Sequence, residues 1–116
     1  MEEARVKILV YAAIRRFLMP KFEIGDVIHH RRYGYRGVII GIDAECEASD
    51  EWYERNQTQP RRDQPWYHVL RHKGWEHYVA EENLEPDDTG EKIDHPLVPI
   101  YFPSFHEGKY YQRSRN

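Results

Sequence analysis

The chain has 116 residues, enough for one small domain, and 40% of them are apolar and 14% aromatic, which suffices for a modest core. Its formal charge of −3 argues against the broad basic surface that non-specific nucleic-acid binding requires, although a local basic patch stays open. The single cysteine excludes an internal disulfide and suits a reducing compartment, so we expect a cytoplasmic or nuclear protein. No stretch reaches the roughly 20 apolar residues of a membrane helix, and we expect no membrane partner.

The first segment is predicted to form an amphipathic helix over residues 2–19. Apolar side chains recur at three- and four-residue spacing from Val6 to Leu18. Pro20 ends the helix because the residue before a proline is pushed out of the helical region. We assign residues 1–20 to a helix that either packs on the domain or is the end of a preceding region.

The next segment is predicted to form a β-hairpin. Val27–Arg32 is predicted to be a strand, and Tyr33–Tyr35 is predicted to be a turn in which Gly34 is free to take a positive φ. Gly37–Ile42 is rich in β-branched residues and interrupted by glycine, which predicts a strand that is buried on both sides or strongly bent.

A long polar loop and a second hairpin follow. Asp43–Asp63 is acidic at first and then polar, and Ser49 could cap a short helix that begins near Asp50. Asn56–Asp63 is predicted to be an exposed loop. Pro65–Arg71 and Trp75–Val79 are the predicted strands of the hairpin.

The remaining residues suggest less regular structure. Glu81–Pro86 is predicted to be one helical turn that ends at Pro86, and a short final strand is predicted after the turn. Ile93–Asn116 is rich in proline and aromatic residues and is predicted to be an extended tail laid over the body. The predicted fold is therefore mainly β: a small SH3-like antiparallel β-barrel over residues 21–111, with an N-terminal α-helix and a tail at 112–116.

The tip of the first hairpin is the strongest candidate for binding. Its arginines can pair with phosphate or carboxylate, and its tyrosines can stack on a base or pack on the barrel. The acidic segments that flank it would repel a duplex if they share its face. The candidate residues at this tip, for binding either protein or DNA, are Arg31, Arg32, Tyr33, Tyr35 and Arg36.

The second hairpin carries a cluster of aromatic residues. Alternation along its strands places Tyr67, Val69 and Val79 in the core. Trp66 and Trp75 could belong either to the core or to a binding surface, because tryptophan is also common in interaction hot spots.

Catalytic and metal sites are not expected. Cys46 lies among acidic residues that disfavour a reactive thiolate, and no serine has the sequence context of a nucleophile. Among the seven histidines, His68, His72 and His77 lie on the second hairpin, but the four-residue spacing of the first two is too wide for one ion. We therefore predict no catalytic residue, no metal ligand and no cofactor.

Three segments, taken in order, resemble the YccV/HspQ family, also called the hemimethylated-DNA-binding domain. They are His30–Asp43 (HRRYGYRGVIIGID), Pro65–Leu70 (PWYHVL) and Tyr78–Leu84 (YVAEENL). Within that family, Glu51-Trp52 and the tail from His95 to Tyr111 make the chain most similar to the C-terminal copy in eukaryotic F-box-only proteins.

The resemblance implies an SH3-like barrel and a role near regulated proteolysis. Bacterial members are heat-shock-related, have been assigned binding to hemimethylated DNA and act with an ATP-dependent protease. A chloroplast member is a protease adaptor, and the F-box relatives belong to cullin-type ubiquitin ligases. We therefore expect a non-catalytic module that binds a protein of the degradation machinery or its substrate. The alternative is a domain that binds hemimethylated DNA.

Overall fold

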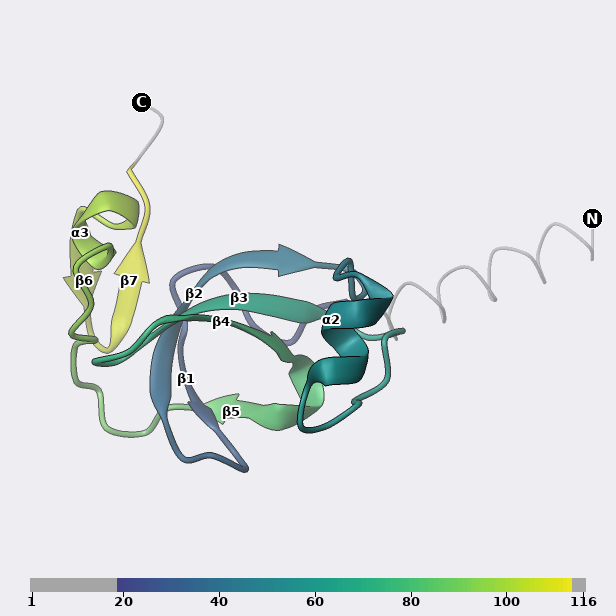
Figure 1. The fold of residues 1–116 in the computed structure, drawn as a ribbon. Helices are drawn as coiled ribbons and strands as arrows, with labels where there is room; N and C mark the ends of the chain where they lie inside the picture. The colour runs from purple at the N-terminus through teal and green to yellow at the C-terminus, as the bar shows by residue number, and fades with distance from the viewer. Residues whose placement is uncertain (1–18, 114–116) are drawn as a thin grey trace, which may run out of the picture.

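A computed structural model describes residues 19–113, so the predicted N-terminal helix lies outside the described residues. The described part is built on one five-stranded antiparallel sheet with the strand order β4-β3-β2-β1-β5 (Figure 1). Its strands are β1 (Val27–His30), β2 (Arg36–Asp43), β3 (Trp66–Arg71), β4 (Glu76–Ala80) and β5 (Leu84–Pro86). The prediction of a mainly β domain is confirmed.

The two predicted hairpins are present. β1 pairs with β2 through a turn in which Gly34 has a φ of 75°, a left-handed conformation that glycine adopts without strain. β3 pairs with β4, and Trp75 lies in the connecting turn rather than in a strand.

A single 3-10 turn, η1 (Glu81–Asn83), joins the two edges of the sheet, since β4 precedes it and β5 follows it. The predicted helical turn over Glu81–Pro86 is therefore shorter than expected, because Leu84–Pro86 pairs with β1 instead. This bent sheet, with its edges linked by one short turn, has the connectivity of an SH3-like barrel, although β4 and β5 form no ladder with each other among the described residues.

The central strands bury side chains on both of their faces, as the sequence of β2 predicted. One cluster gathers Phe22, Ile28, Ile39, Tyr67, Val69, Val79 and Leu84. The other gathers Val27, Val38, Leu70, Ile93, Val98, Phe102 and Tyr110. Adjacent residues on one strand, such as Val38 and Ile39, fall in different clusters because successive side chains of a strand point to opposite faces.

The C-terminal segment differs from the predicted extended tail. It contains α3 (Val98–Tyr101) and a hairpin of β6 (Ser104–His106) and β7 (Lys109–Tyr111), which lie together at one end of the sheet (Figure 1). Tyr110 and Gly25 hold this unit against the sheet, where the Tyr110 amide donates to the Gly25 carbonyl over 2.9 Å. Among the aromatic residues that suggested an extended chain, Phe102 and Tyr110 are instead buried in the second core cluster, whereas Pro96, Pro99 and Pro103 are exposed.

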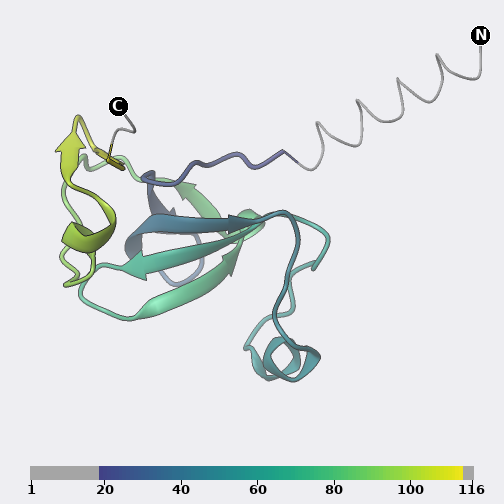
Figure 2. The ribbon, with the colours of Figure 1, turned by 90° about the horizontal axis from the view of Figure 1, so that it is seen from above.

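The segment between β2 and β3 projects away from the sheet at the opposite end. It carries α2 (Asp50–Arg55), which stands off the strands in Figure 2. Ser49 caps the helix as predicted, because its hydroxyl accepts a hydrogen bond from the Trp52 amide over 3.1 Å. None of the described helices has the length and apolar character needed to cross a membrane.

Candidate binding groove

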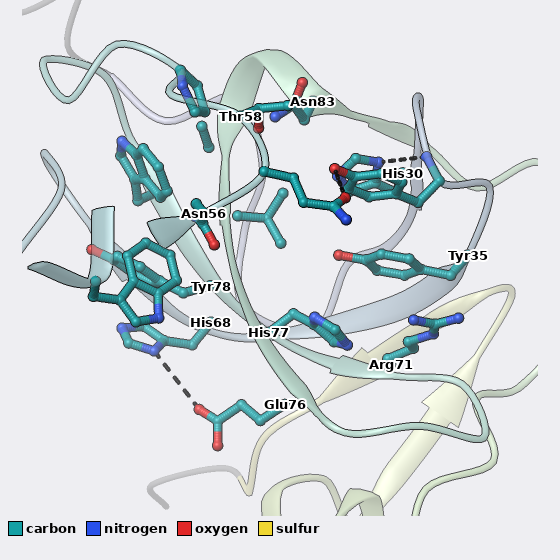
Figure 3. Close-up of a pocket in the computed structure, with 17 residues that line it drawn as sticks. His30, Tyr35, Asn56, Thr58, His68, Arg71, Glu76, His77, Tyr78 and Asn83 are labelled. Carbon is teal, nitrogen blue, oxygen red and sulfur yellow. Dashed lines mark hydrogen bonds and ion pairs between the residues drawn. The ribbon is translucent and has the colours of Figure 1, made fainter. Parts of the chain in front are cut away.

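A groove of about 830 Å³ lies between the projecting segment and the sheet. Residues 52–60 form one wall, and the tip of the first hairpin together with β3 and β4 forms the rest (Figure 3). We call it the aromatic groove, because five aromatic rings and three imidazoles line it. These are Tyr33, Tyr35, Trp52, Trp66, Tyr78, His30, His68 and His77.

One end of the groove is a packed cluster of rings. Trp52 meets Trp66 and Tyr78 edge-on, with ring centroids 6.2 and 5.7 Å apart. Trp66 is 1% exposed, and its indole N–H donates to the Arg61 carbonyl over 3.2 Å. This end therefore offers a preformed apolar wall, since its rings are held by packing and by hydrogen bonds.

A hydrogen-bonded network fixes the same end from beneath. The Tyr78 hydroxyl donates to Asp43 Oδ2 over 2.6 Å, and His68 Nε2 lies 3.1 Å from the same oxygen. Burial, and then the hydrogen bond to Asp43, raise the pKa of Tyr78, so its hydroxyl stays protonated. The arrangement orients side chains, and among the described residues no serine or cysteine completes a nucleophile–base pair with His68.

The other end is a stack centred on Tyr35. Figure 3 shows the Tyr35 ring between His30 and His77, with Arg71 beside it. The ring centroids of His30 and His77 lie 4.9 and 5.1 Å from that of Tyr35, and Arg71 Cζ lies 4.6 Å from it. Burial raises the pKa of Tyr35 to about 12, so its hydroxyl is neutral throughout the physiological range.

Both imidazoles of this stack are held neutral. His30 is 3% exposed, and its Nδ1 accepts hydrogen bonds from the Arg32 and Tyr33 amides over 3.1 and 3.0 Å. Burial, with the charges of His77 and other neighbours, lowers the pKa of His30 to about 4. Burial, and then the charge of Arg71, lower the pKa of His77.

His77 also carries a polar atom without a partner. Its Nε2 is buried and forms no hydrogen bond within the described part of the chain. Leaving such an atom unpaired costs about 1–3 kcal/mol, so a bound group that pairs with it would recover that free energy.

The three candidate arginines of the hairpin tip differ in their environments. Arg36 is 15% exposed and forms a two-point ion pair with the buried carboxylate of Asp87, at 2.8 and 3.1 Å, so its guanidinium already has a partner within the fold. Arg31 donates to the Leu84 carbonyl over 3.1 Å and lies 3.8 Å from Glu85. Arg32 is exposed at the tip, with its guanidinium 5.9 Å from the centroid of the Tyr33 ring.

The four candidate aromatic residues also differ in where they lie relative to the groove. Tyr33 and Tyr35 line the groove, and the Tyr33 hydroxyl donates to Gln57 Oε1 across it over 2.8 Å. Trp66 belongs to the core and forms part of the groove floor. Trp75 is 81% exposed and is not among the residues that line the groove. Whether any of them binds a partner stays a prediction.

Sequence reasoning missed Arg71 and Trp52 as site residues and considered His77 only as a metal ligand. The signal available was the length of the segment between β2 and β3, since long loops with buried rings are often functional. The second hairpin does not gather its histidines: His68 pairs with Asp43, whereas His72 Nδ1 accepts from the Asp94 amide over 2.8 Å. Within residues 19–113, no group of three histidine, cysteine or acidic side chains could hold a metal ion.

A bent five-stranded sheet with a groove beside it defines a small, mainly β domain. The chain belongs to the YccV-like family, whose model, described as hemimethylated DNA-binding protein YccV like, matches residues 20–109. It is 39% identical to F-box only protein 21 of Mus musculus, and 38% identical to the proteins of that name from Pongo abelii and Homo sapiens. Each alignment covers 87 residues, 72% of this chain and 14% of the relative, so the chain spans about a seventh of the length of these relatives.

Proposed function

We propose that this domain is a non-catalytic protein-interaction module in regulated proteolysis, and that the aromatic groove is where its partner binds. The F-box proteins to which it is similar support a setting in a cytoplasmic or nuclear ubiquitin ligase. The partner is then a degradation substrate or a component of the degradation machinery.

The observation that carries the proposal is the character of the groove. Its walls combine tyrosine and tryptophan rings with amides and one guanidinium, and tyrosine, tryptophan and arginine are the residue types enriched in protein-binding hot spots. Its volume of about 830 Å³ suits several side chains of an extended peptide. The rings are held in place before binding, so little ordering entropy opposes the association.

DNA binding is the second candidate, because the family is described as hemimethylated DNA-binding. Electrostatics give it less support. Arg36 forms an ion pair with Asp87, and Arg31 lies 3.8 Å from Glu85. Of the three arginines predicted at the tip, Arg32 is therefore the one with no carboxylate partner among the described residues. A phosphate backbone needs several such cations.

Filling the groove tests the proposal. In a full-length protein that contains this chain, Thr58→Trp places a ring in the groove, whereas Arg55→Trp adds the same ring on exposed α2 outside it. We expect the first variant to lose a set of co-purified proteins that the second retains. Equal sets from the two variants would contradict the proposal, provided that amide NMR spectra show both domains folded.

The DNA alternative has its own test. A mobility-shift titration would use hemimethylated, fully methylated and unmethylated duplexes at two salt concentrations. The alternative predicts binding tighter than about 100 μM at low salt that weakens steeply with added salt. Salt-dependent binding that prefers the hemimethylated duplex would replace the protein-interaction proposal with the DNA-binding one.

A further inference from the structure

Arg71 is partly buried and has no described carboxylate within 4 Å, whereas the other described arginines without one, Arg32, Arg55 and Arg113, are exposed. Arg31, Arg36, Arg61 and Arg62 each have a carboxylate within 4 Å. The guanidinium of Arg71 forms no ion pair or side-chain hydrogen bond within residues 19–113, and its one described contact is the face of Tyr35. It is nevertheless half-buried at the wall of the groove.

Two further polar groups without partners lie beside it. The Tyr35 hydroxyl forms no hydrogen bond in the described part of the chain, and Figure 3 shows it directed into the groove. His77 Nε2 is buried and unpaired below the same ring. A guanidinium, a neutral hydroxyl and a neutral imidazole, all without partners, thus meet at one end of an apolar groove.

The chemistry of this end suits a single anion of planar shape. A guanidinium binds a carboxylate through two parallel N–H···O bonds, and the Tyr35 hydroxyl can donate a further one. A ligand that reaches His77 would select the tautomer with a proton on Nε2, because a carboxylate only accepts hydrogen bonds. Stacking on Tyr35 holds Arg71 in place before the ligand arrives.

Charge on the rest of the groove favours one carboxylate over a phosphate chain. Glu76 lines the groove, and Asp43 lies behind its aromatic end. These acids would repel a ligand with successive negative charges, whereas a single carboxylate neutralises Arg71 and leaves the apolar end for a ring.

We propose that the aromatic groove is a receptor for a peptide that carries one carboxylate and a nearby aromatic side chain, with the carboxylate on Arg71 and Tyr35 and the ring against Trp52 and Tyr78. This assignment rests on the proposed function and adds the chemical class of the partner. The carboxylate can be a chain terminus or an acidic side chain, and the test separates the two.

Three short peptides and an oligonucleotide test this assignment by NMR titration of the 116-residue chain. The probes are acetyl-glycyl-tryptophan with a free carboxylate, the same peptide as its amide, acetyl-tryptophyl-glutamic acid amide, and single-stranded oligothymidine. We expect at least one carboxylate peptide to bind about tenfold or more tightly than the neutral amide, since a charge-assisted hydrogen bond contributes that much. The carboxylate peptide that binds more tightly shows whether the groove prefers the carboxylate of a chain terminus or that of an acidic side chain.

Matched variants locate the carboxylate. Arg71→Ala is expected to remove the preference for the carboxylate over the amide. Tyr35→Phe, which keeps the ring stack and the guanidinium, is expected to weaken it. Arg55→Ala, on the exposed face of α2, is the control and is expected to keep the preference. The His77 imidazole gives an independent readout, because a bound carboxylate beside Arg71 raises the pKa of His77.

Equal binding of acid and amide, or tighter binding of the oligonucleotide than of any peptide, would overturn the assignment. Failure of all the peptides would also overturn it. The proposed function would survive that result if Thr58→Trp still removes co-purified proteins, so the two failures are distinguishable.

Discussion

Arg36 and Asp87 form a two-point ion pair in which the carboxylate is 3% exposed and the guanidinium also donates to the Glu91 carbonyl over 2.6 Å. The pair ties β2 to the segment after β5. Burial opposes ionisation of Asp87, but hydrogen bonds from Arg36 and Thr89 outweigh burial and lower the pKa of Asp87.

Breaking this pair is expected to destabilise the fold. Asp87→Asn leaves the charge of Arg36 buried without a partner, and such losses cost about 3–5 kcal/mol. Urea unfolding at pH 7, followed by fluorescence, measures the change. Asp63→Asn is the control, because the Arg61–Asp63 pair is exposed and contributes little. Equal effects from the two variants would show that burial of the Asp87 pair adds nothing.

Stability is expected to fall as the pH drops below 6.5 because of His30. The folded domain protonates His30 only near pH 4, while the unfolded chain protonates it near 6.5. The unfolded state therefore binds more protons within this window, and the shift is equivalent to about 3 kcal/mol. The contribution is complete above pH 6.5 and is lost as the pH falls towards 4.

His30→Asn tests this origin, because its amide oxygen can still accept from the Arg32 and Tyr33 amides. We expect the variant to lose the part of the pH dependence between 6.5 and 4 in urea unfolding that comes from His30, while His77, whose pKa burial also lowers, keeps its own part. His106→Gln, which removes an exposed imidazole, should keep it. An unchanged pH dependence in His30→Asn would assign it to other groups.

Trp66 and Trp75 should respond in opposite ways to truncation. Trp66→Ala removes a ring that is 1% exposed and is expected to cost about 3–5 kcal/mol. Trp75→Ala removes a ring that is 81% exposed and should change stability by less than about 0.5 kcal/mol. Thermal unfolding of the two variants measures both changes, and a large loss of stability in Trp75→Ala would place that ring in a contact absent from this structure.

The C-terminal unit should be required for stability. Phe102→Ala opens a cavity between α3 and the sheet and is expected to cost about 3–5 kcal/mol, as in other large-to-small core changes. Ile100→Ala, on the exposed face of the same helix, is the control and should have little effect. Similar unfolding midpoints for the two variants would mean that the unit is a loosely attached tail.

Local sequence signals predicted the local structure well. Gly34 marked the first hairpin turn, Ser49 marked the start of α2, and the β-branched run of β2 marked a strand covered on both faces. Each of these depends on backbone conformation or on alternation within a few residues, which a single sequence contains.

The parts that were not predicted depend on contacts between distant residues. The C-terminal unit folds because Tyr110 and Phe102 cover a core face that β1, β2 and β3 leave open. The ion pair between Arg36 and Asp87 was not predicted, because the two residues lie 51 positions apart in the sequence. The Arg71 end of the groove likewise requires Tyr35 and His77 to converge from two hairpins, which no spacing in the sequence indicates.

Site-specific photo-crosslinking tests the central claim, that the aromatic groove binds a protein partner, most directly. A photoreactive amino acid would replace Thr58 in the groove of a full-length protein, and exposed Asp88 outside the groove in a control. We predict that position 58 yields a discrete protein adduct in cells, that position 88 does not, and that Arg71→Ala weakens the adduct. Adducts of equal yield at the two positions, or adducts to DNA at position 58, would contradict the claim.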